Sequence, residues 1–383
     1  MIVAACGSSS SHGTGDGGAP PPSGRWVLGY YVGYSIDSYP IAEIDWTSLT
    51  HIAFAPMVVG GDGSIDLSFD DAHGTGVADA QALAQAAHAH DVKALAMLGG
   101  AGAGGPIATY ASTANRAAFV TRLLAAIDSI GFDGIDLDWE DSVDLDSLVA
   151  LAHDLRAARP SIVLTYPGGP INGNFQTADP KYADLAVSLD QFNIQTYYPT
   201  TAFAGQGWDS WFLAPVSGVT GSTPIAIDDT FARYAALGIP KAKLGMGTAF
   251  YAICYTGGIT GPRQPTDGGA QIVGGDNAYP LADFYASGGT FATHASAVMR
   301  DATAKQPYLS FATPVADAHC GASTQYISYE DEVSIADKGA FATAGGYGGI
   351  IIWTINEGYL PANATGGRAR TAMMTALRDA FLK

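Results

Sequence analysis

Charged side chains are scarce in this sequence of 383 residues. Only 14% of the residues are Asp, Glu, Lys or Arg, and 18 basic residues stand against 36 acidic ones, for a formal net charge of −18. Such a chain repels polyanions, so nucleic acid and an anionic membrane surface are poor partners, whereas a neutral polymer remains compatible. Long apolar runs are missing as well. Because no stretch of about 18 apolar residues occurs, we expect no membrane-spanning segment.

Cysteine is also sparse, with three residues in all. Cys254 and Cys320 are an even pair at either end of one irregular segment. We predict a disulfide between them, which indicates an oxidising compartment; two buried thiols are the alternative.

The third cysteine, Cys6, belongs to a start of different composition. Val3-Ala4-Ala5-Cys6 resembles a bacterial lipobox, although the charged start and most of the apolar segment expected before it are missing. A chance likeness is the alternative. We interpret residues 1–24 as a lipobox-like start, with Cys6 as the lipidation site, followed by a flexible linker rich in Ser, Gly and Pro. The expected location is extracytoplasmic, as a bacterial cell-envelope lipoprotein or a secreted protein.

Residues 25–383 alternate short apolar runs with amphipathic stretches, and 48% of the whole chain is hydrophobic. Eight candidate strands are separated by helical patterns, a rhythm that predicts an α/β fold, the (β/α)8 TIM barrel, as one catalytic domain. The interval from Tyr251 to Tyr326 is too long for a βα loop, so we predict a small insertion after the seventh strand, at about 252–326. The expected strands are Trp26–Val32, Thr50–Met57, Val92–Leu98, Asp133–Trp139, Ser161–Tyr166, Gln191–Tyr197, Lys243–Ala249 and Gly349–Trp353, and Arg368–Leu382 is expected to close the chain as a helix.

The fourth expected strand carries three carboxylates. From Ile135 to Glu140 apolar residues alternate with Asp136, Asp138 and Glu140. A strand places alternate side chains on one face, with Cα atoms about 6.6 Å apart, so the three acids share a face. Crowded like charges raise at least one pKa and keep a proton available near neutral pH, as a general acid requires.

Two structural explanations compete with catalysis. The acids could form the wet face of an antiparallel sheet, but their partner face is unusually apolar for that. They could ligate calcium, but a calcium loop needs polar, Gly-containing spacers, whereas the spacers here are strand formers. We therefore favour a catalytic role, with Glu140 at the strand end, where a barrel enzyme meets its substrate.

The run from Asp133 to Glu140, Asp-Gly-Ile-Asp-Leu-Asp-Trp-Glu, resembles the D-G-x-D-x-D-W-E signature of family 18 glycoside hydrolases, the chitinases and their relatives. The likeness continues in family order from Trp26 to Trp353. It implies retaining hydrolysis of β-1,4-linked N-acetylglucosamine polymers (chitin), in which the substrate's own acetamide oxygen attacks the anomeric carbon.

The same resemblance implies a role for each site residue. Glu140 is the acid and then the base, Asp138 orients the acetamide, Asp136 shares a proton beside it, and Tyr197 donates to the acetamide oxygen. Trp353 is the apolar floor under the sugar. Further expected substrate contacts are Gln195, Tyr30, Phe54, Gly99, Gly100 and Tyr251.

Two positions depart from the family pattern. Met97 stands where the third strand commonly has a serine, and Tyr198 follows Tyr197 where Asp or Asn is common. Alternative functions are an endo-β-N-acetylglucosaminidase acting on N-glycan cores and a non-catalytic chitin-binding lectin. The eight histidines show no ligand spacing, so we expect no metal and no cofactor. A monomer with a chitin or related N-acetylglucosamine-containing glycan as partner is expected.

Overall fold

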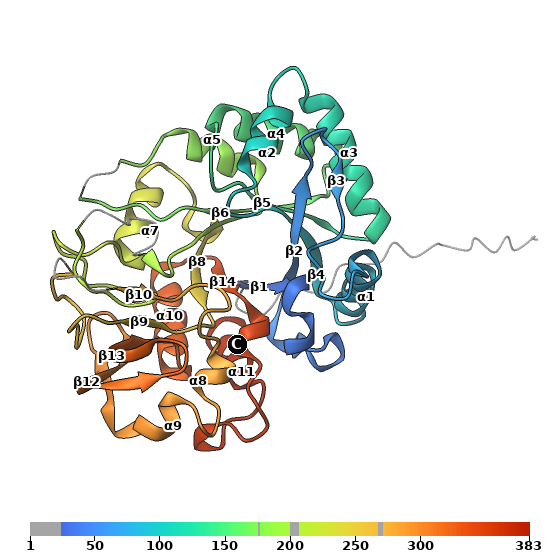
Figure 1. Cartoon of the computed structure of the whole chain (residues 1–383). Helices are drawn as coiled ribbons and strands as arrows, with labels where there is room; N and C mark the ends of the chain where they lie inside the picture. Colours follow the sequence, from blue (N-terminus) through green and yellow to red (C-terminus); the bar gives the residue numbers. More distant parts are fainter. Residues whose placement is uncertain (1–23, 175–176, 200–206, 267–270) are drawn as a thin grey trace, which may run out of the picture.

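The computed structural model of the protein describes residues 24–174, 177–199, 207–266 and 271–383. Eight parallel strands close into a barrel in the order β1-β14-β8-β7-β6-β5-β4-β2, with β2 pairing again with β1 (Figure 1). The predicted TIM barrel is thereby confirmed. The barrel strands are β1 (Trp26–Val32), β2 (His51–Val59), β4 (Lys93–Gly99), β5 (Gly134–Asp138), β6 (Val163–Gly168), β7 (Gln191–Ile194), β8 (Leu244–Ala249) and β14 (Gly349–Trp353).

Helices lie outside the strands (Figure 1). They are α1 (Gly76–Ala89), α2 (Gly104–Ala111), α3 (Arg116–Ile130), α4 (Leu145–Ala158), α5 (Lys181–Ser188), α7 (Ile227–Ala236), α10 (Glu332–Gly345) and α11 (Ala372–Leu377). Short turns of helix, η1 (Gly33–Ser38) and η6 (Ile355–Gly358), follow β1 and β14. No helix in the described ranges has both the length and the apolar character needed to cross a bilayer.

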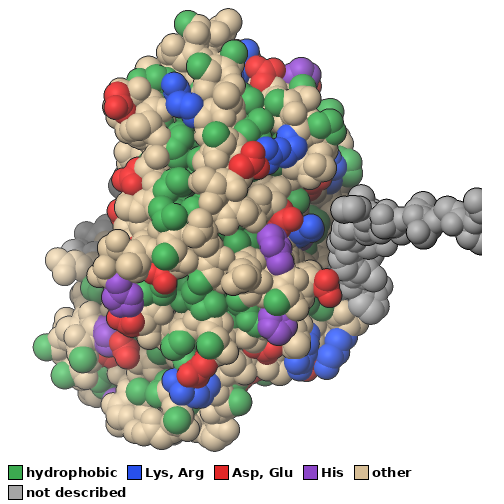
Figure 2. All heavy atoms as spheres, turned by 90° about the vertical axis from the view of Figure 1, so that its right-hand side faces the viewer, with side chains coloured by type: hydrophobic (Ala, Val, Ile, Leu, Met, Phe, Trp, Pro, Cys, Tyr) green, Lys and Arg blue, Asp and Glu red, His purple; other side chains and the backbone are tan. Residues whose placement is uncertain are grey.

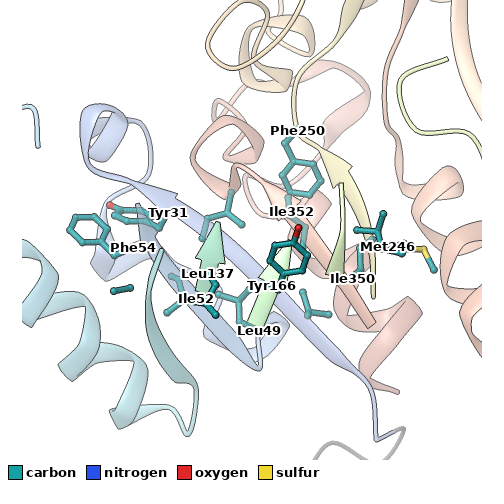
Figure 3. Close-up of a cluster of buried hydrophobic side chains, with 14 of the residues drawn as sticks. Tyr31, Leu49, Ile52, Phe54, Leu137, Tyr166, Met246, Phe250, Ile350 and Ile352 are labelled. Atoms are coloured by element: carbon teal, nitrogen blue, oxygen red, sulfur yellow. The ribbon is translucent and has the colours of Figure 1, made fainter. Parts of the chain in front are cut away.

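The strands are apolar on both faces because each is covered twice. Leu28, Ala53 and Leu95 point into the barrel, where they pack together. Side chains on the other face of the strands, among them Ile52 and Leu137, belong to a separate, larger cluster, part of which Figure 3 shows. The main core therefore lies between the barrel and its helices.

The insertion after the seventh barrel strand forms an antiparallel sheet. Its order is β10-β9-β13-β12-β11, and the disulfide Cys254–Cys320 lies within it. The hydroxyl group of Tyr279, in the loop before α8, donates a 2.8 Å hydrogen bond to Asp317 at the end of β12. Its elements are β9 (Ile253–Tyr255), β10 (Ile272–Val273), α8 (Leu281–Phe284), α9 (Thr290–His294), β11 (Val298–Asp301), β12 (Gln306–Asp317) and β13 (Gly321–Ser328).

The end of the chain differs from the expected single helix over Arg368–Leu382. Regular helix begins only at Ala372, and Gly366 and Gly367 just before it have positive φ of 77° and 69°. Arg368 itself is extended, with φ −62° and ψ 135°, and residues 370–371 form a turn, so the helix cannot begin at the predicted position. The final turn, Arg378–Leu382, widens to a π-helix.

Candidate active site

The C-terminal ends of the barrel strands surround an open cleft of about 820 Å³. Since parallel strands end together at one side of a barrel, side chains far apart in the sequence meet there. Among the expected site residues, those that line the cleft are Glu140, Asp138, Tyr197, Gln195, Gly99, Gly100, Tyr251 and Trp353.

The carboxylates of β5 form a graded series along the strand. Asp136 is 0% exposed and Asp138 is 2% exposed, whereas Glu140, just beyond the strand, is open to solvent. Leu137 and Trp139, between them, pack in the outer core. The period-two pattern thus aims all three acids inward and upward, with the last one in the cleft.

Asp136 is held by two hydroxyl groups. Tyr30 Oη donates to Oδ2 at 2.9 Å, and Thr165 Oγ1 donates to Oδ1. Burial raises the pKa of Asp136 to about 6, and the two hydrogen bonds limit that rise because they stabilise the carboxylate. At neutral pH Asp136 therefore carries a charge deep inside the barrel.

Asp138 has a different state. Burial, and then the charges of Glu140 and Asp136, raise its pKa well above the usual range, and it hydrogen-bonds Glu140 as the protonated partner. Its Oδ1 is buried without a hydrogen-bond partner among the described residues. Asp138 thus has a proton directed toward Glu140 and one acceptor atom left for a ligand.

Glu140 receives a second contact from β7's C-terminal end. Gln195 Nε2 donates to Glu140 Oε1 at 2.8 Å. The sequence predicted Gln195 as a substrate contact, and this hydrogen bond to Glu140 was not part of that prediction. The amide orients the Glu140 carboxyl group, because it holds one of the two carboxyl oxygens in place.

Tyr197 and Trp353 form the apolar walls beside the acids. A Cβ on Gly247 would lie 2.8 Å from the Tyr197 ring, so β8 has a glycine there to admit the tyrosine. Burial, Tyr251 and Glu140 raise the pKa of Tyr197, so its hydroxyl keeps its proton and can donate. The Trp353 ring lies 5.2 Å from that of Tyr30 and is half-buried, with one side on the cleft.

Gly99 and Gly100 make the close approach of two strands possible. Their φ values are 111° and 99°, and a Cβ on Gly99 would lie 2.2 Å from the carbonyl oxygen of Asp138. Gly100 N–H donates to that same oxygen at 2.8 Å. Only glycine fits this backbone at Gly99, and the two residues line the cleft beside Asp138.

Phe54 was wrongly expected to contact substrate. It is 0% exposed and packs between Tyr31 and Phe69 in the outer core, where Figure 3 shows it beside Tyr31. The alternation of β2 turns Ala53 and Ala55 into the barrel and Phe54 away from it. The prediction that Tyr30 contacts the sugar directly is also wrong, because Tyr30 is 1% exposed and its hydroxyl group donates to Asp136.

One part of the cleft wall was not anticipated, and it adjoins Trp353, whose side chain hydrogen-bonds Asp276. Tyr34 from η1 and Asp276 from the loop after β10 line it and hydrogen-bond to each other, 242 residues apart in the sequence. Below them Glu357, 3% exposed, accepts N–H groups from Asn277 and Thr354. Burial and then the charge of Asp276 raise the pKa of Glu357 to about 9, so it is neutral at pH 7. Tyr198, the family departure, also lines the cleft.

Asp71, His73 and Asp79 form the group of potential metal ligands found in the described ranges, with ligand atoms within 4.8 Å of one another. None of the three lines the cleft. His73 is already paired with Asp37 at 3.2 Å. We therefore assign this group no part in the chemistry of the cleft.

Comparison with known proteins agrees with this geometry. Residues 27–358 match the family described as "Glycosyl hydrolases family 18". A "Probable endochitinase" of Caenorhabditis elegans and "Chitinase 1" of Aphanocladium album are each 26% identical over 64% of this chain. The chain spans only 40% and 57% of the length of these two relatives.

Among solved structures, the Group IV chitinase of Ostrinia furnacalis superposes with a TM-score of 0.75 at 18% identity, over 94% of this chain and 100% of that one. A chitinase-like agglutinin from Robinia pseudoacacia superposes with a TM-score of 0.70 at 20% identity, over 92% and 99%. At such identities these two likenesses establish the fold alone. Because the family match covers residues 27–358, most of this chain, the chain belongs to family 18 of the glycosyl hydrolases.

Proposed function

We propose that the protein is a chitinase that hydrolyses β-1,4-linked N-acetylglucosamine polymers with retention of configuration. The observation that carries the proposal is the position of Glu140, solvent-open in the cleft and hydrogen-bonded to a protonated, buried Asp138. A family member that had lost hydrolysis would not need this acid. The cleft's aromatic and glycine lining suits an uncharged sugar chain, and among the described residues that line it none is Lys or Arg.

In the first step Glu140 gives its proton to the glycosidic oxygen as the bond from that oxygen to C1 breaks. The two other acids of β5 are 0% and 2% exposed and cannot reach the anomeric carbon as nucleophiles. As the resemblance to family 18 implies, the substrate's acetamide oxygen forms the new bond to C1, giving an oxazolinium ion. Water then attacks C1 from the vacated side, loses a proton to Glu140 and reopens the ring, so the configuration is retained.

Asp138 and Tyr197 hold the acetamide for this attack. The unpartnered Oδ1 of Asp138 accepts the acetamide N–H, and its proton supports Glu140 as that residue becomes a carboxylate. The Tyr197 hydroxyl donates to the acetamide oxygen and fixes its line of approach. The charge on Asp136 stabilises the positive oxazolinium ion through Asp138. Trp353 supports the apolar face of the sugar.

Glu140→Gln tests the proposal. The variant keeps the shape and the Gln195 contact but has no proton to donate, so hydrolysis of chitotetraose should fall by roughly three orders of magnitude or more. Glu43 is an exposed acid near Arg370, and Glu43→Gln is the matched control, which should retain full activity. Full activity in Glu140→Gln would refute the assignment. Circular dichroism and thermal melting establish that both variants are folded.

An endo-β-N-acetylglucosaminidase is the nearest alternative, because the same acid constellation can cleave the chitobiose core of an N-glycan. Product release from chitotetraose and from a high-mannose glycoprotein, measured side by side, separates the two activities. Faster release from the glycoprotein would favour the alternative.

A sugar-binding protein without turnover is the second alternative, and the likeness to an agglutinin is the observation that favours it. The retained Glu140–Asp138 pair argues against it. Retention of chitotetraose on the folded protein with no reducing-end release would establish this alternative.

We also propose that the protein acts outside the cytoplasm. The Cys254–Cys320 disulfide supports an oxidising compartment. Cys6 lies outside the described residues, and its lipidation stays a prediction. An acyl group on Cys6, detected by mass spectrometry of the native protein, would support an envelope anchor, and an unmodified thiol would refute it.

On the face in Figure 2 acidic and basic side chains are interspersed, with no broad basic field for a polyanion. Gel filtration tests the expected monomer.

A further inference from the structure

Asp136 has two in-register neighbours on the adjacent barrel strands. The parallel pairing places Met97 of β4 on one side of it and Thr165 of β6 on the other. Residues in register on neighbouring strands share a face, so both side chains point at Asp136 inside the barrel. Met97 is 1% exposed and has only a thioether, which cannot donate a hydrogen bond. Thr165 is 0% exposed and donates through its hydroxyl.

We propose that Thr165 is a positioning residue of the hydrolytic site, which holds the Asp136 carboxylate from β6 because β4 offers no donor at the matching position. The inference rests on the proposed hydrolysis. Tyr30 already serves Oδ2. Without the Thr165 hydroxyl, Oδ1 of a fully buried carboxylate has no partner, and an unpaired buried charge is costly. Loss of the donor therefore favours the protonated form of Asp136.

A protonated Asp136 alters the acids above it. The Asp136 charge is one of the causes that keep the proton on Asp138, and Asp138 is the partner of Glu140. Loss of the charge therefore weakens the stabilisation of the oxazolinium ion in the cleft. Activity should then require a pH high enough to ionise Asp136 again, so the acidic limb of the pH profile moves upward.

The groups that face Asp136 limit what else can produce such a shift. Tyr30 from β1 and Asp138 from β5 itself are its titratable neighbours in the described structure, followed by Glu140 above them. Tyr30 has its pKa raised far above neutrality and does not titrate in the working range. The strands on either side present only Met97 and Thr165, which carry no charge.

Thr165→Val and Thr165→Ser are the test pair. Valine matches threonine in shape but lacks the hydroxyl, whereas serine keeps it. The acidic limb of kcat/KM for chitotetraose should move upward by about one to two pH units in Thr165→Val, and stay near the wild-type position in Thr165→Ser.

Urea unfolding at pH 4 and pH 8 provides a readout that needs no turnover. The ratio of the unfolding equilibrium constant of Thr165→Val to that of Thr165→Ser should be roughly ten- to a hundredfold larger at pH 8 than at pH 4. The reason is that only the ionised carboxylate of Asp136 needs the hydroxyl donor. An equal ratio at the two pH values would show that the Thr165 side chain only packs, and it would overturn the proposal. An acidic limb of kcat/KM at the same pH in Thr165→Val and wild type would overturn it as well. If the wild type itself fails to hydrolyse chitotetraose, the proposed function fails, while the unfolding comparison still decides the role of Thr165.

Discussion

Asp136→Asn should stabilise the protein at neutral pH while impairing catalysis. Asp136 is 0% exposed, and its pKa rises from the usual 3.8 to about 6. A rise of about 2 units corresponds to roughly 3 kcal/mol. Between pH 3.8 and about 6 the folded protein binds the extra proton that the unfolded chain has lost, so the free energy of unfolding falls as pH rises. Asparagine has no charge to bury and can still bond to both hydroxyl groups.

Urea unfolding of wild type and Asp136→Asn across pH 4 to 8 measures this cost. The stability of the variant relative to wild type should increase by roughly 2–3 kcal/mol from pH 4 to pH 7 and then level off. Asp133→Asn is the matched control on the same segment. The pKa of Asp133 is lowered, because hydrogen bonds from Ala94, His88 and Lys93 outweigh its burial, so that variant should lose stability relative to wild type as pH rises through the acidic range. A pH-independent difference for Asp136→Asn would refute the assignment of a buried charge to Asp136.

Other expectations concern the core and the cleft floor. Lys338→Met should lower the free energy of unfolding by about 3–5 kcal/mol at pH 7, because it leaves the Glu330 carboxylate, paired at 2.7 Å and 0% exposed, without its cation. Lys181→Met, which breaks an exposed ion pair with Asp146, should have a far smaller effect in the same denaturation assay, and equal losses in the two variants would contradict the argument. Trp353→Ala should reduce kcat/KM for chitotetraose roughly tenfold or more through loss of the stacking floor, whereas Phe54→Leu should lower the melting temperature and leave KM unchanged; a raised KM in Phe54→Leu would reinstate it as a substrate contact.

The barrel and the central acids were predictable because their signals are local. The alternation from Ile135 to Glu140 indicates a strand and its inward face without any knowledge of its neighbours. The same logic failed at Phe54, because parallel barrel strands are apolar on both faces and the pattern does not reveal which face is which. Ala53 and Ala55, small residues suited to a narrow barrel interior, were the available signal.

Contacts between distant segments were not predictable. The hydrogen bond between Tyr34 and Asp276 joins the loop after the first strand to the insertion, and no periodicity in either segment indicates it. The donor from Thr165 to Asp136 depends on strand register, which the sequence of one strand does not specify. The absence of a serine at Met97 showed that a donor was missing, but not which strand replaces it.

The anomeric form of the first product tests the central claim most directly. We expect ¹H NMR of chitotetraose hydrolysis, recorded within the first minutes and before mutarotation, to show the new reducing end as the β-anomer. Retention follows if the acetamide forms the intermediate and water enters from the vacated face with Glu140 as the base. Initial release of the α-anomer would mean that water attacks C1 directly. It would contradict the claim that Asp136 and Asp138 support attack by the substrate's own acetamide oxygen.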